Sequence, residues 1–342
     1  MRECGASQGK VRVQKKAARA ALAVAVSGAL VALVIAQLDL AEATARFRAA
    51  RPGWLAAAAL ASFSVLLLRG ARFTTLGRHA GFGLTTAATA IQNFLNRVTP
   101  LRLGELSLPW LLRRHAGEDA ARAVLSVVLV RVIDLTLVLA AVALGLALRD
   151  AGEGAPPLLP TVAALAAFCV LLAAFRPLLR AGFAAARVVA GITGLGRVPA
   201  VGRAIDRLHA AVAGGEALSR GQLARVAACS LGIYAGQMTL FYALLAAFEV
   251  EVGFLELLQG GAVAMGGAAV PIAAVGSIGT QEAAWVAGFA WVGVPLQDAL
   301  VTAVACQLIT LAFAGIFALP AWLWLARLPR AGGDPAPPLP DA

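Results

Sequence analysis

The sequence predicts an all-α, polytopic integral membrane protein, a bundle of membrane-crossing helices. Of the 342 residues, 60% are hydrophobic and only 14% are charged, and the mean hydropathy is +0.82. Soluble domains carry about 25% charged residues, so a soluble core does not account for this much apolar sequence. Several apolar runs approach the roughly 20 residues that a helix needs to cross a bilayer. The runs are continuous rather than alternating, which disfavours a transmembrane β-barrel.

Six apolar runs are interpreted as full spans. They lie at about 20–38, 53–68, 123–148, 158–175, 226–248 and 299–325. The first run is too long for the apolar part of a signal peptide and no clear cleavage site follows it, so we expect an uncleaved helix. The spans belong to one transmembrane domain over 20–327, preceded by a basic N-terminus at 1–19. A Pro-rich tail at 328–342 is expected to be disordered.

Two further apolar regions, at about 83–115 and 257–295, are interrupted in the middle. Pro100 and Gly104 divide the first, and Pro271 divides the second, which is also rich in glycine. Proline removes a helix hydrogen bond, and glycine lowers helix preference. Each region therefore predicts a re-entrant hairpin of two short helices, because broken backbone at membrane depth must be buried in protein or line a wet cavity.

The charges of the loops predict the orientation. Arginine-rich segments lie at the N-terminus, at 69–82, at 176–225 and at the C-terminus, whereas the loops at 150–157 and 249–256 carry acids. By the positive-inside rule both termini are cytoplasmic, and the multi-pass chain lies in a bacterial inner membrane. The two hairpins then enter from opposite sides, which is the arrangement of an inverted repeat.

Composition also limits the function. The formal net charge is +11, from 29 Lys and Arg against 18 acids, and no nucleic-acid-binding motif accompanies it. Cytoplasmic loops that touch anionic lipid account for the excess. The four cysteines and three histidines show no metal-ligand spacing, and we find no catalytic set and no phosphate-binding glycine motif. We therefore expect no nucleic acid, no metal and no cofactor.

Isolated charges and amides in the apolar chain are the candidate substrate-binding residues, because charge inside a membrane is costly without a function or a partner. They are Asn93, Asn96, Arg97, Glu105, Arg131, Asp134, Gln281 and Glu282. Glu105 suits a headgroup amine or hydroxyl or a proton-linked switch, and its structural alternative is an ion pair with Arg97, Arg102 or Arg131. Glu282 suits the external counterpart of that site.

Arg131 and Asp134 stand three residues apart on one helix face and can pair with each other. They either clamp the first hairpin or leave Arg131 to hold a lipid phosphate, for which a guanidinium is well shaped. The asparagines suit the broken backbone better than a headgroup. Gly232 and Gly236 form a G-x-x-x-G motif that favours packing within the chain over a dimer face.

Two motifs carry a family resemblance. The residues P-L-R-L-G-E-L at 100–106 and V-R-V-I-D-L at 130–135 resemble the lysylphosphatidylglycerol synthase transmembrane family, and Gly276, Gly279 and Glu282 resemble its second glycine–glutamate pattern. The family often has an arginine late in its last helices, where this chain has Gln307. The larger synthases also carry a soluble aminoacyltransferase domain, and this chain is expected to be a stand-alone member without one.

The resemblance implies a flippase-like protein that moves an anionic phospholipid or a lipid-linked substrate between leaflets. A membrane-embedded lipid transferase is a second hypothesis, with an acid as general base and an arginine as phosphate clamp. A third is a non-catalytic membrane partner of a separate synthase or glycosyltransferase. We lean away from an enzyme because aminoacyl transfer is expected to need the soluble domain.

Overall fold

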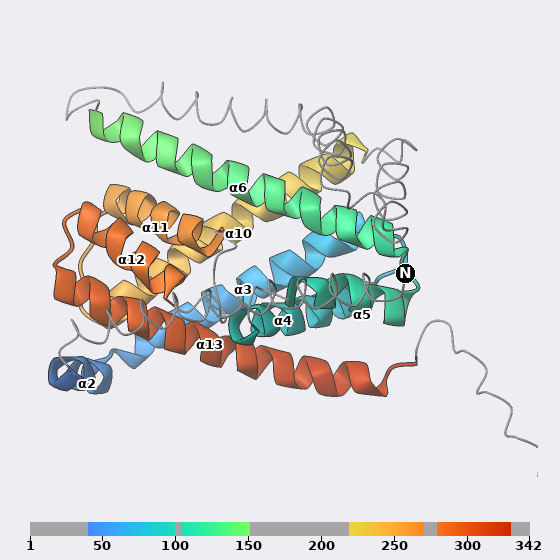
Figure 1. Cartoon of the computed structure of the whole chain (residues 1–342), viewed down its shortest axis with the longest axis horizontal. Helices are drawn as coiled ribbons and strands as arrows, with labels where there is room; N and C mark the ends of the chain where they lie inside the picture. Colours follow the sequence, from blue (N-terminus) through green and yellow to red (C-terminus); the bar gives the residue numbers. More distant parts are fainter. Residues whose placement is uncertain (1–39, 100–103, 151–218, 270–278, 330–342) are drawn as a thin grey trace, which may run out of the picture. The chain divides into compact units, whose positions relative to one another are not determined.

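The computed structural model describes residues 40–99, 104–150, 219–269 and 279–329, and the regular structure in these ranges is helical, namely α-helices and one 3-10 turn at 104–106 (Figure 1). The predicted all-α membrane fold is confirmed. The described helices are α2 (Leu40–Ala49), α3 (Pro52–Leu76), α4 (Phe82–Val98), α5 (Ser107–Ala116), α6 (Ala120–Asp150), α10 (Arg220–Ala247), α11 (Phe254–Ala269), α12 (Thr280–Trp291) and α13 (Leu296–Arg327).

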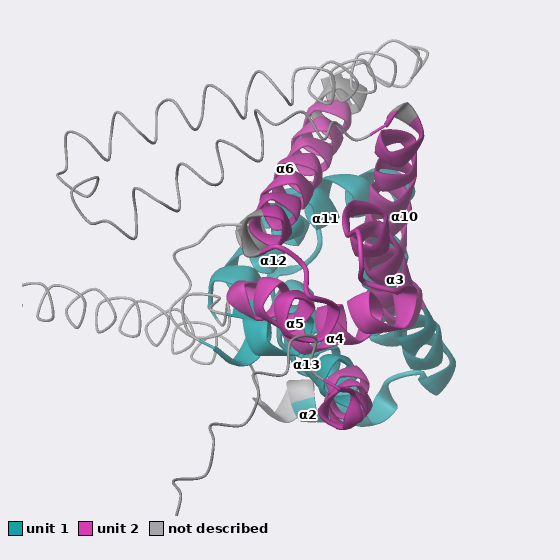
Figure 2. Cartoon of the chain, turned by 90° about the vertical axis from the view of Figure 1, so that its right-hand side faces the viewer, with its two compact units in different colours: residues 1–60, 93–104, 238–316 teal, residues 61–92, 105–237, 317–342 magenta. Residues whose placement is uncertain are grey.

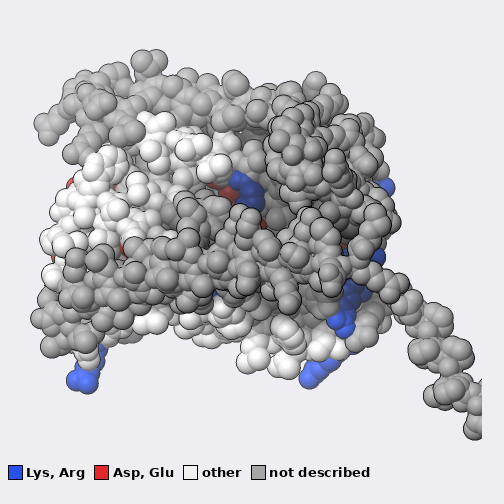
Figure 3. All heavy atoms as spheres, in the orientation of Figure 1, with Lys and Arg blue, Asp and Glu red and all other residues white. Residues whose placement is uncertain are grey.

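Four of these helices, α3, α6, α10 and α13, are long and apolar enough to cross a membrane. They match four of the six predicted spans, and the other two, at 20–38 and 158–175, lie outside the described residues. The termini and the loop at 176–218 also lie outside them. On the face shown in Figure 3 the described atoms are mostly uncharged, as expected for helices that meet lipid.

One predicted boundary is wrong, and one helix was not predicted. The second span does not end at Leu68, because α3 continues to Leu76 and includes Arg69 and Arg72. No proline or glycine cluster stops the helix before Gly77, and the apolar run alone understated its length. Of the basic segment predicted at about 176–225, residues 220–225 form the beginning of α10. The helix α2 at Leu40–Ala49 was not predicted.

The two interrupted regions each contain a pair of short helices, α4 with α5 and α11 with α12. These helices have 17, 10, 16 and 12 residues. At 1.5 Å per residue, each is shorter than the roughly 30 Å hydrocarbon layer. The helices stop on either side of Pro100 and Pro271, both of which lie outside the described residues.

The chain divides into two compact units, and each is described by itself (Figure 2). Unit 1 consists of residues 1–60, 93–104 and 238–316, and unit 2 of residues 61–92, 105–237 and 317–342. The helices α3, α4, α10 and α13 run through both units, so each unit holds a part of them.

In unit 1, α11 and α12 pack face to face through glycines. A side-chain carbon at Gly288 would lie 2.5 Å from the carbonyl oxygen of Gly260, so this close approach requires glycine. Beside this contact, the buried Trp285 packs against Phe289 with the two rings tilted by 48°, and its Nε1 donates a 3.0 Å hydrogen bond to Thr302 of α13. The helix pair is thereby fixed to the start of α13.

The ends of the α11–α12 pair lie at one end of unit 1. Arg51, just before α3, forms a 2.8 Å ion pair with Glu249, which precedes α11. Arg46 of α2 pairs with Asp298 in the first turn of α13. Arg46 and Arg51 are five residues apart on the chain. The pair therefore starts and finishes near the same point.

Unit 2 has the same feature in its own helix pair. Glu118, two residues after α5, accepts hydrogen bonds at Oε1 from the backbone amides of Arg78, His79 and Ala80, at 2.6, 2.6 and 3.3 Å. These amides lie just before α4. One buried carboxylate thus joins the start of α4 to the end of α5.

The G-x-x-x-G motif of α10 packs inside unit 2. A side-chain carbon at Gly232 would lie 3.0 Å from Leu68 Cδ1, and one at Gly236 would lie 2.7 Å from Val65 Cγ2. Both partners are on α3. The prediction that the motif serves packing within the chain is confirmed.

Candidate functional site

The C-terminal end of α4 carries three of the predicted residues and begins a tight turn. Gly104 donates a 3.1 Å hydrogen bond to Thr99 Oγ1, and a side-chain carbon at Gly104 would lie 2.4 Å from the backbone nitrogen of Asn96. Only glycine fits so close to another backbone. The chain therefore folds back on the last turn of α4, which holds Asn96 and Arg97.

The side chain of Arg97 is buried without the usual partners. Its Nε and Nη1 are shielded from solvent and make no hydrogen bond with any described residue, and the same is true of Asn96 Oδ1. A buried guanidinium with unmet donors costs several kcal/mol unless something else satisfies it. Asn93, one turn earlier, does have a polar partner.

Glu282 sits in the first turn of α12 and is buried, with 7% of its surface exposed. Its Oε2 accepts a 2.7 Å hydrogen bond from the backbone amide of Gly279, the residue that caps the helix. Gly279 has φ of +91°, which favours glycine. The positive end of the helix dipole supports a negative side chain here. Gln281 precedes it and is half-buried.

Arg97 and Glu282 lie within range of each other's charge inside unit 1. Arg97 interacts electrostatically with Glu282 and with Cys306 of α13. Gln307, the next residue of α13, is buried, and both its Oε1 and its Nε2 lack a partner within the described residues. We call Asn96, Arg97, Glu282 and Gln307 the unit 1 cluster.

The unit 1 cluster offers complementary chemistry in a small apolar region. The Arg97 guanidinium presents a planar set of donors that suits phosphate oxygens. Glu282 contributes a negative charge, which suits an amine, and Gln307 contributes both a donor and an acceptor. The cluster comes from a broken end of α4, the start of α12 and the long helix α13.

In unit 2, Glu105 forms an ion pair with Arg131 of α6. Their side chains are 29% and 44% exposed, although the surrounding helices are apolar. Of the alternatives for Glu105, the structure contains the pair with Arg131. A half-exposed pair on a membrane helix requires water or polar headgroups beside it.

Asp134, also on α6, pairs with Arg72 of α3 rather than with Arg131. The two Arg72–Asp134 hydrogen bonds measure 2.5 and 3.2 Å, and Arg72 Nη1 also donates to Ser230 of α10 at 3.0 Å. The predicted pairing of Arg131 with Asp134 is therefore wrong. Each side chain finds a better placed partner on another element than its neighbour three residues along the helix.

Sequence reasoning missed Arg72 and did not assign a role to Gln307. Arg72 was counted among cytoplasmic loop residues because the apolar run was ended at Leu68. Its spacing of three from Arg69, with no proline between Arg69 and Leu76, was compatible with a helix that continued through Gly70. Gln307 was noted only as the residue in place of a family arginine.

The structure brings together Arg97 with Glu282, and Glu105 with Arg131. These two groups belong to different units. Among the described residues, no group of three metal-ligating side chains occurs. The polar side chains of these two groups are guanidinium, carboxylate and amide groups.

A scan against protein families matches residues 20–318 to the model described as the lysylphosphatidylglycerol synthase TM region. The chain belongs to this family. The match covers most of the chain, includes every predicted site residue, and confirms the resemblance seen in the two motifs. A search of curated proteins finds no match. As a member of this membrane-domain family, the protein is a multi-pass membrane protein linked to phospholipid handling.

Proposed function

We propose that this protein translocates a phospholipid or lipid-linked substrate between the leaflets of a bacterial plasma membrane, with the headgroup bound at the unit 1 cluster. The observation that carries the proposal is the buried Arg97, whose Nε and Nη1 have no partner in the described residues. The free-energy cost of burying these donors is offset when a ligand supplies the missing hydrogen-bond acceptors. A lipid phosphate offers oxygens in the geometry that a guanidinium binds.

The charge of Glu282 adds to this selectivity. Its carboxylate lies in electrostatic range of Arg97 and is held by the capping bond to Gly279. A headgroup that carries a phosphate and also an amine or a hydroxyl can bind Arg97 through the phosphate and Glu282 through the second group. Bulk hydrocarbon has neither group, so the cluster favours a headgroup over a lipid tail.

We further propose that α4–α5 and α11–α12 are re-entrant hairpins. Each helix is too short to cross the hydrocarbon layer, and the contacts of Glu118 and of Arg46 and Arg51 draw the two ends of each pair together. Transporters commonly bind substrate where such broken helices meet at membrane depth. The unit 1 cluster takes residues from one helix of each pair.

The Glu105–Arg131 pair is a second polar position for the moving headgroup. Its partial exposure on apolar helices supports a location beside water or headgroups. Asp134 acts differently, because it holds Arg72 between α3, α6 and α10. In this proposal Glu105 and Arg131 contact substrate, and Asp134 positions the helices.

The proposal is tested in proteoliposomes that contain a lipid with a fluorescent headgroup. Wild-type protein is expected to speed the appearance of label in the opposite leaflet, and Glu105→Gln and Arg131→Ala are expected to slow it. Mass spectrometry of the same lipids should find no new chemical species. A protein that leaves leaflet distribution unchanged but alters the lipid chemically is a transferase, and that result rejects the proposal.

A further inference from the structure

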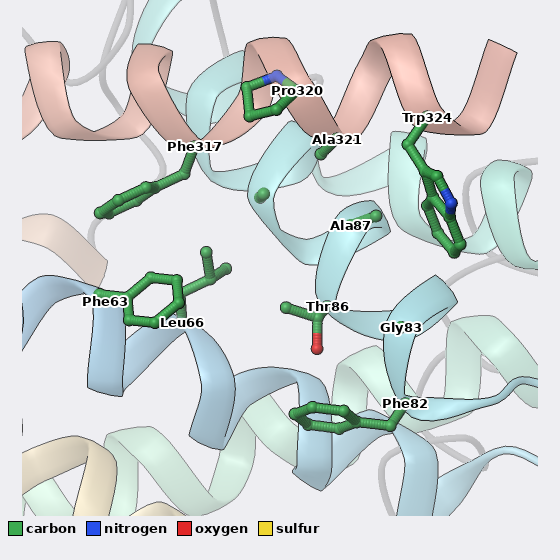
Figure 4. Close-up of a pocket in the computed structure, with 11 residues that line it drawn as sticks. Phe63, Leu66, Phe82, Gly83, Thr86, Ala87, Phe317, Pro320, Ala321 and Trp324 are labelled. Atoms are coloured by element: carbon green, nitrogen blue, oxygen red, sulfur yellow. The ribbon is translucent and has the colours of Figure 1, made fainter.

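Unit 2 contains an open apolar groove of about 350 Å³ between α3, α4 and α13, which is within the size of small-molecule sites (Figure 4). It is lined by Phe63, Leu66, Phe82, Gly83, Thr86, Ala87, Ala90, Phe317, Pro320, Ala321 and Trp324. None of these residues belongs to the candidate headgroup site. The groove is a separate feature, and a ligand could bind in it whether or not the protein translocates lipid.

Aromatic side chains form the walls of the groove, and small residues leave its space open. At one end of the groove, the ring centroids of Phe63 and Phe317 are 5.6 Å apart. Trp324 lies at the other end and faces α4 across the groove (Figure 4). A side-chain carbon at Gly83 would lie 3.4 Å from the Trp324 ring. Larger residues at Gly83 or Ala321 would therefore occupy the groove.

The groove offers little hydrogen-bonding surface to a ligand. Thr86 and Trp324 are the lining residues whose side chains carry a polar atom, and the Thr86 oxygen points away from α13 (Figure 4). A side-chain carbon at Gly70 of α3 would lie 2.1 Å from Thr86 Oγ1, so the hydroxyl is packed against that glycine. A ligand in the groove meets mostly carbon, which suits a hydrocarbon chain.

Two arginines lie close in sequence to residues that line one end of the groove. Arg327 follows Trp324 by three residues in the last turn of α13, and Arg78 precedes Phe82 by four residues. Both arginines are exposed. Tryptophan prefers the headgroup level of a membrane, and arginines near it attract anionic headgroups.

We propose that this groove binds one acyl chain of an anionic phospholipid, with the phosphate of that lipid beside Arg327. The helices α3 and α13 are candidate spans, so the groove lies at a depth where hydrocarbon is the available occupant. Lipid tails and apolar side chains are equally apolar, so transfer from water does not favour the groove over the bilayer. An acyl chain therefore binds because its shape fits the groove. The positive charge at the end of the groove selects the headgroup.

The test uses the full-length protein in lipid nanodiscs and phosphatidylglycerol with a photoreactive group on one acyl chain. Illumination is expected to label peptides of α4 and α13, and unlabelled phosphatidylglycerol is expected to compete. Ala321→Phe and Gly83→Leu fill the groove and should remove most of the label. Ala326→Phe makes the same change as the first variant at an exposed position of α13 outside the groove, and should leave the label intact.

The headgroup is tested with phosphatidylcholine that carries the same photoreactive chain. Phosphatidylglycerol should label the groove more strongly, and Arg327→Gln should lower its labelling by about fivefold, since one arginine near an anionic lipid contributes on the order of 1 kcal/mol. The proposal is overturned if labelling rises in proportion to lipid content without competition, which indicates bulk lipid only. Equal labelling of Ala321→Phe and Ala326→Phe, or of the two lipids, also overturns it.

Discussion

Arg72 and Asp134 form a two-pronged ion pair between α3 and α6, with hydrogen bonds of 2.5 and 3.2 Å. Only 2% of the surface of Arg72 is exposed, and the same guanidinium also bonds Ser230 of α10. One buried cation thus connects three helices of unit 2. Removing one partner of such a pair strongly lowers the stability of the fold, because the remaining charge is left in an apolar environment.

Replacing Asp134 with leucine is expected to lower the free energy of unfolding by about 3 kcal/mol, since the buried Arg72 loses its counter-charge. Thermal unfolding in detergent measures the change. The double variant Arg72→Leu with Asp134→Leu should recover much of the stability, because it removes both charges together. A double variant that is less stable than Asp134→Leu alone contradicts this account.

Glu118 is expected to control how the α4–α5 pair is held. Glu118→Ala leaves three backbone amides without their acceptor and should lower the free energy of unfolding by roughly 3 kcal/mol or more. Glu118→Gln keeps an oxygen for those amides and serves as the matched control, with a smaller loss. Equal melting temperatures for Glu118→Ala and wild type would show that the carboxylate does not fix these ends.

The sequence predicted the spans better than the contacts between them. Long apolar runs identified α6, α10 and α13 because helix length and hydropathy are local properties. The pairing of Arg131 with Asp134 was wrong because spacing along one helix says nothing about the opposing helices. Arg72 on α3 and Glu105 before α5 compete for those same side chains, and they provide better geometry.

The candidate site shows the same limit. Glu282 and Arg97 were both identified because an isolated charge in an apolar chain is conspicuous. Their charges lie within electrostatic range of each other although the residues are 185 positions apart in sequence, which no local pattern encodes. Gln307 was considered only as the residue in place of a family arginine, so it was not counted among the candidate amides.

Close packing of α10 on α3 gives another prediction. Gly236→Ala places a carbon 2.7 Å from Val65 Cγ2 and should cost about 1–3 kcal/mol of stability. Adding Val65→Ala makes room and should restore the melting temperature. Because the motif packs within the chain, size-exclusion chromatography should find the same oligomeric state for both variants. A change of oligomeric state without a change of stability would favour the dimer-face interpretation instead.

Gln307 is expected to lower the stability of the fold while contributing to headgroup binding. Both polar atoms of its buried amide lack partners in the described part of the chain, so Gln307→Leu should raise the free energy of unfolding by about 1 kcal/mol. The same change removes a polar contact for the headgroup and should slow translocation. A stabilised variant with the wild-type translocation rate would remove Gln307 from the site.

The most direct test compares Arg97→Gln with Arg48→Gln in the proteoliposome assay. Both variants remove one arginine, but Arg97 is in the unit 1 cluster and Arg48 is exposed on α2. With equal reconstitution and similar melting temperatures, Arg97→Gln should reduce the initial rate of headgroup translocation at least tenfold, because a charged hydrogen bond contributes about 1.5–3 kcal/mol. Arg48→Gln should translocate at the wild-type rate. Equal rates for the two variants would contradict the assignment of the unit 1 cluster as the headgroup site.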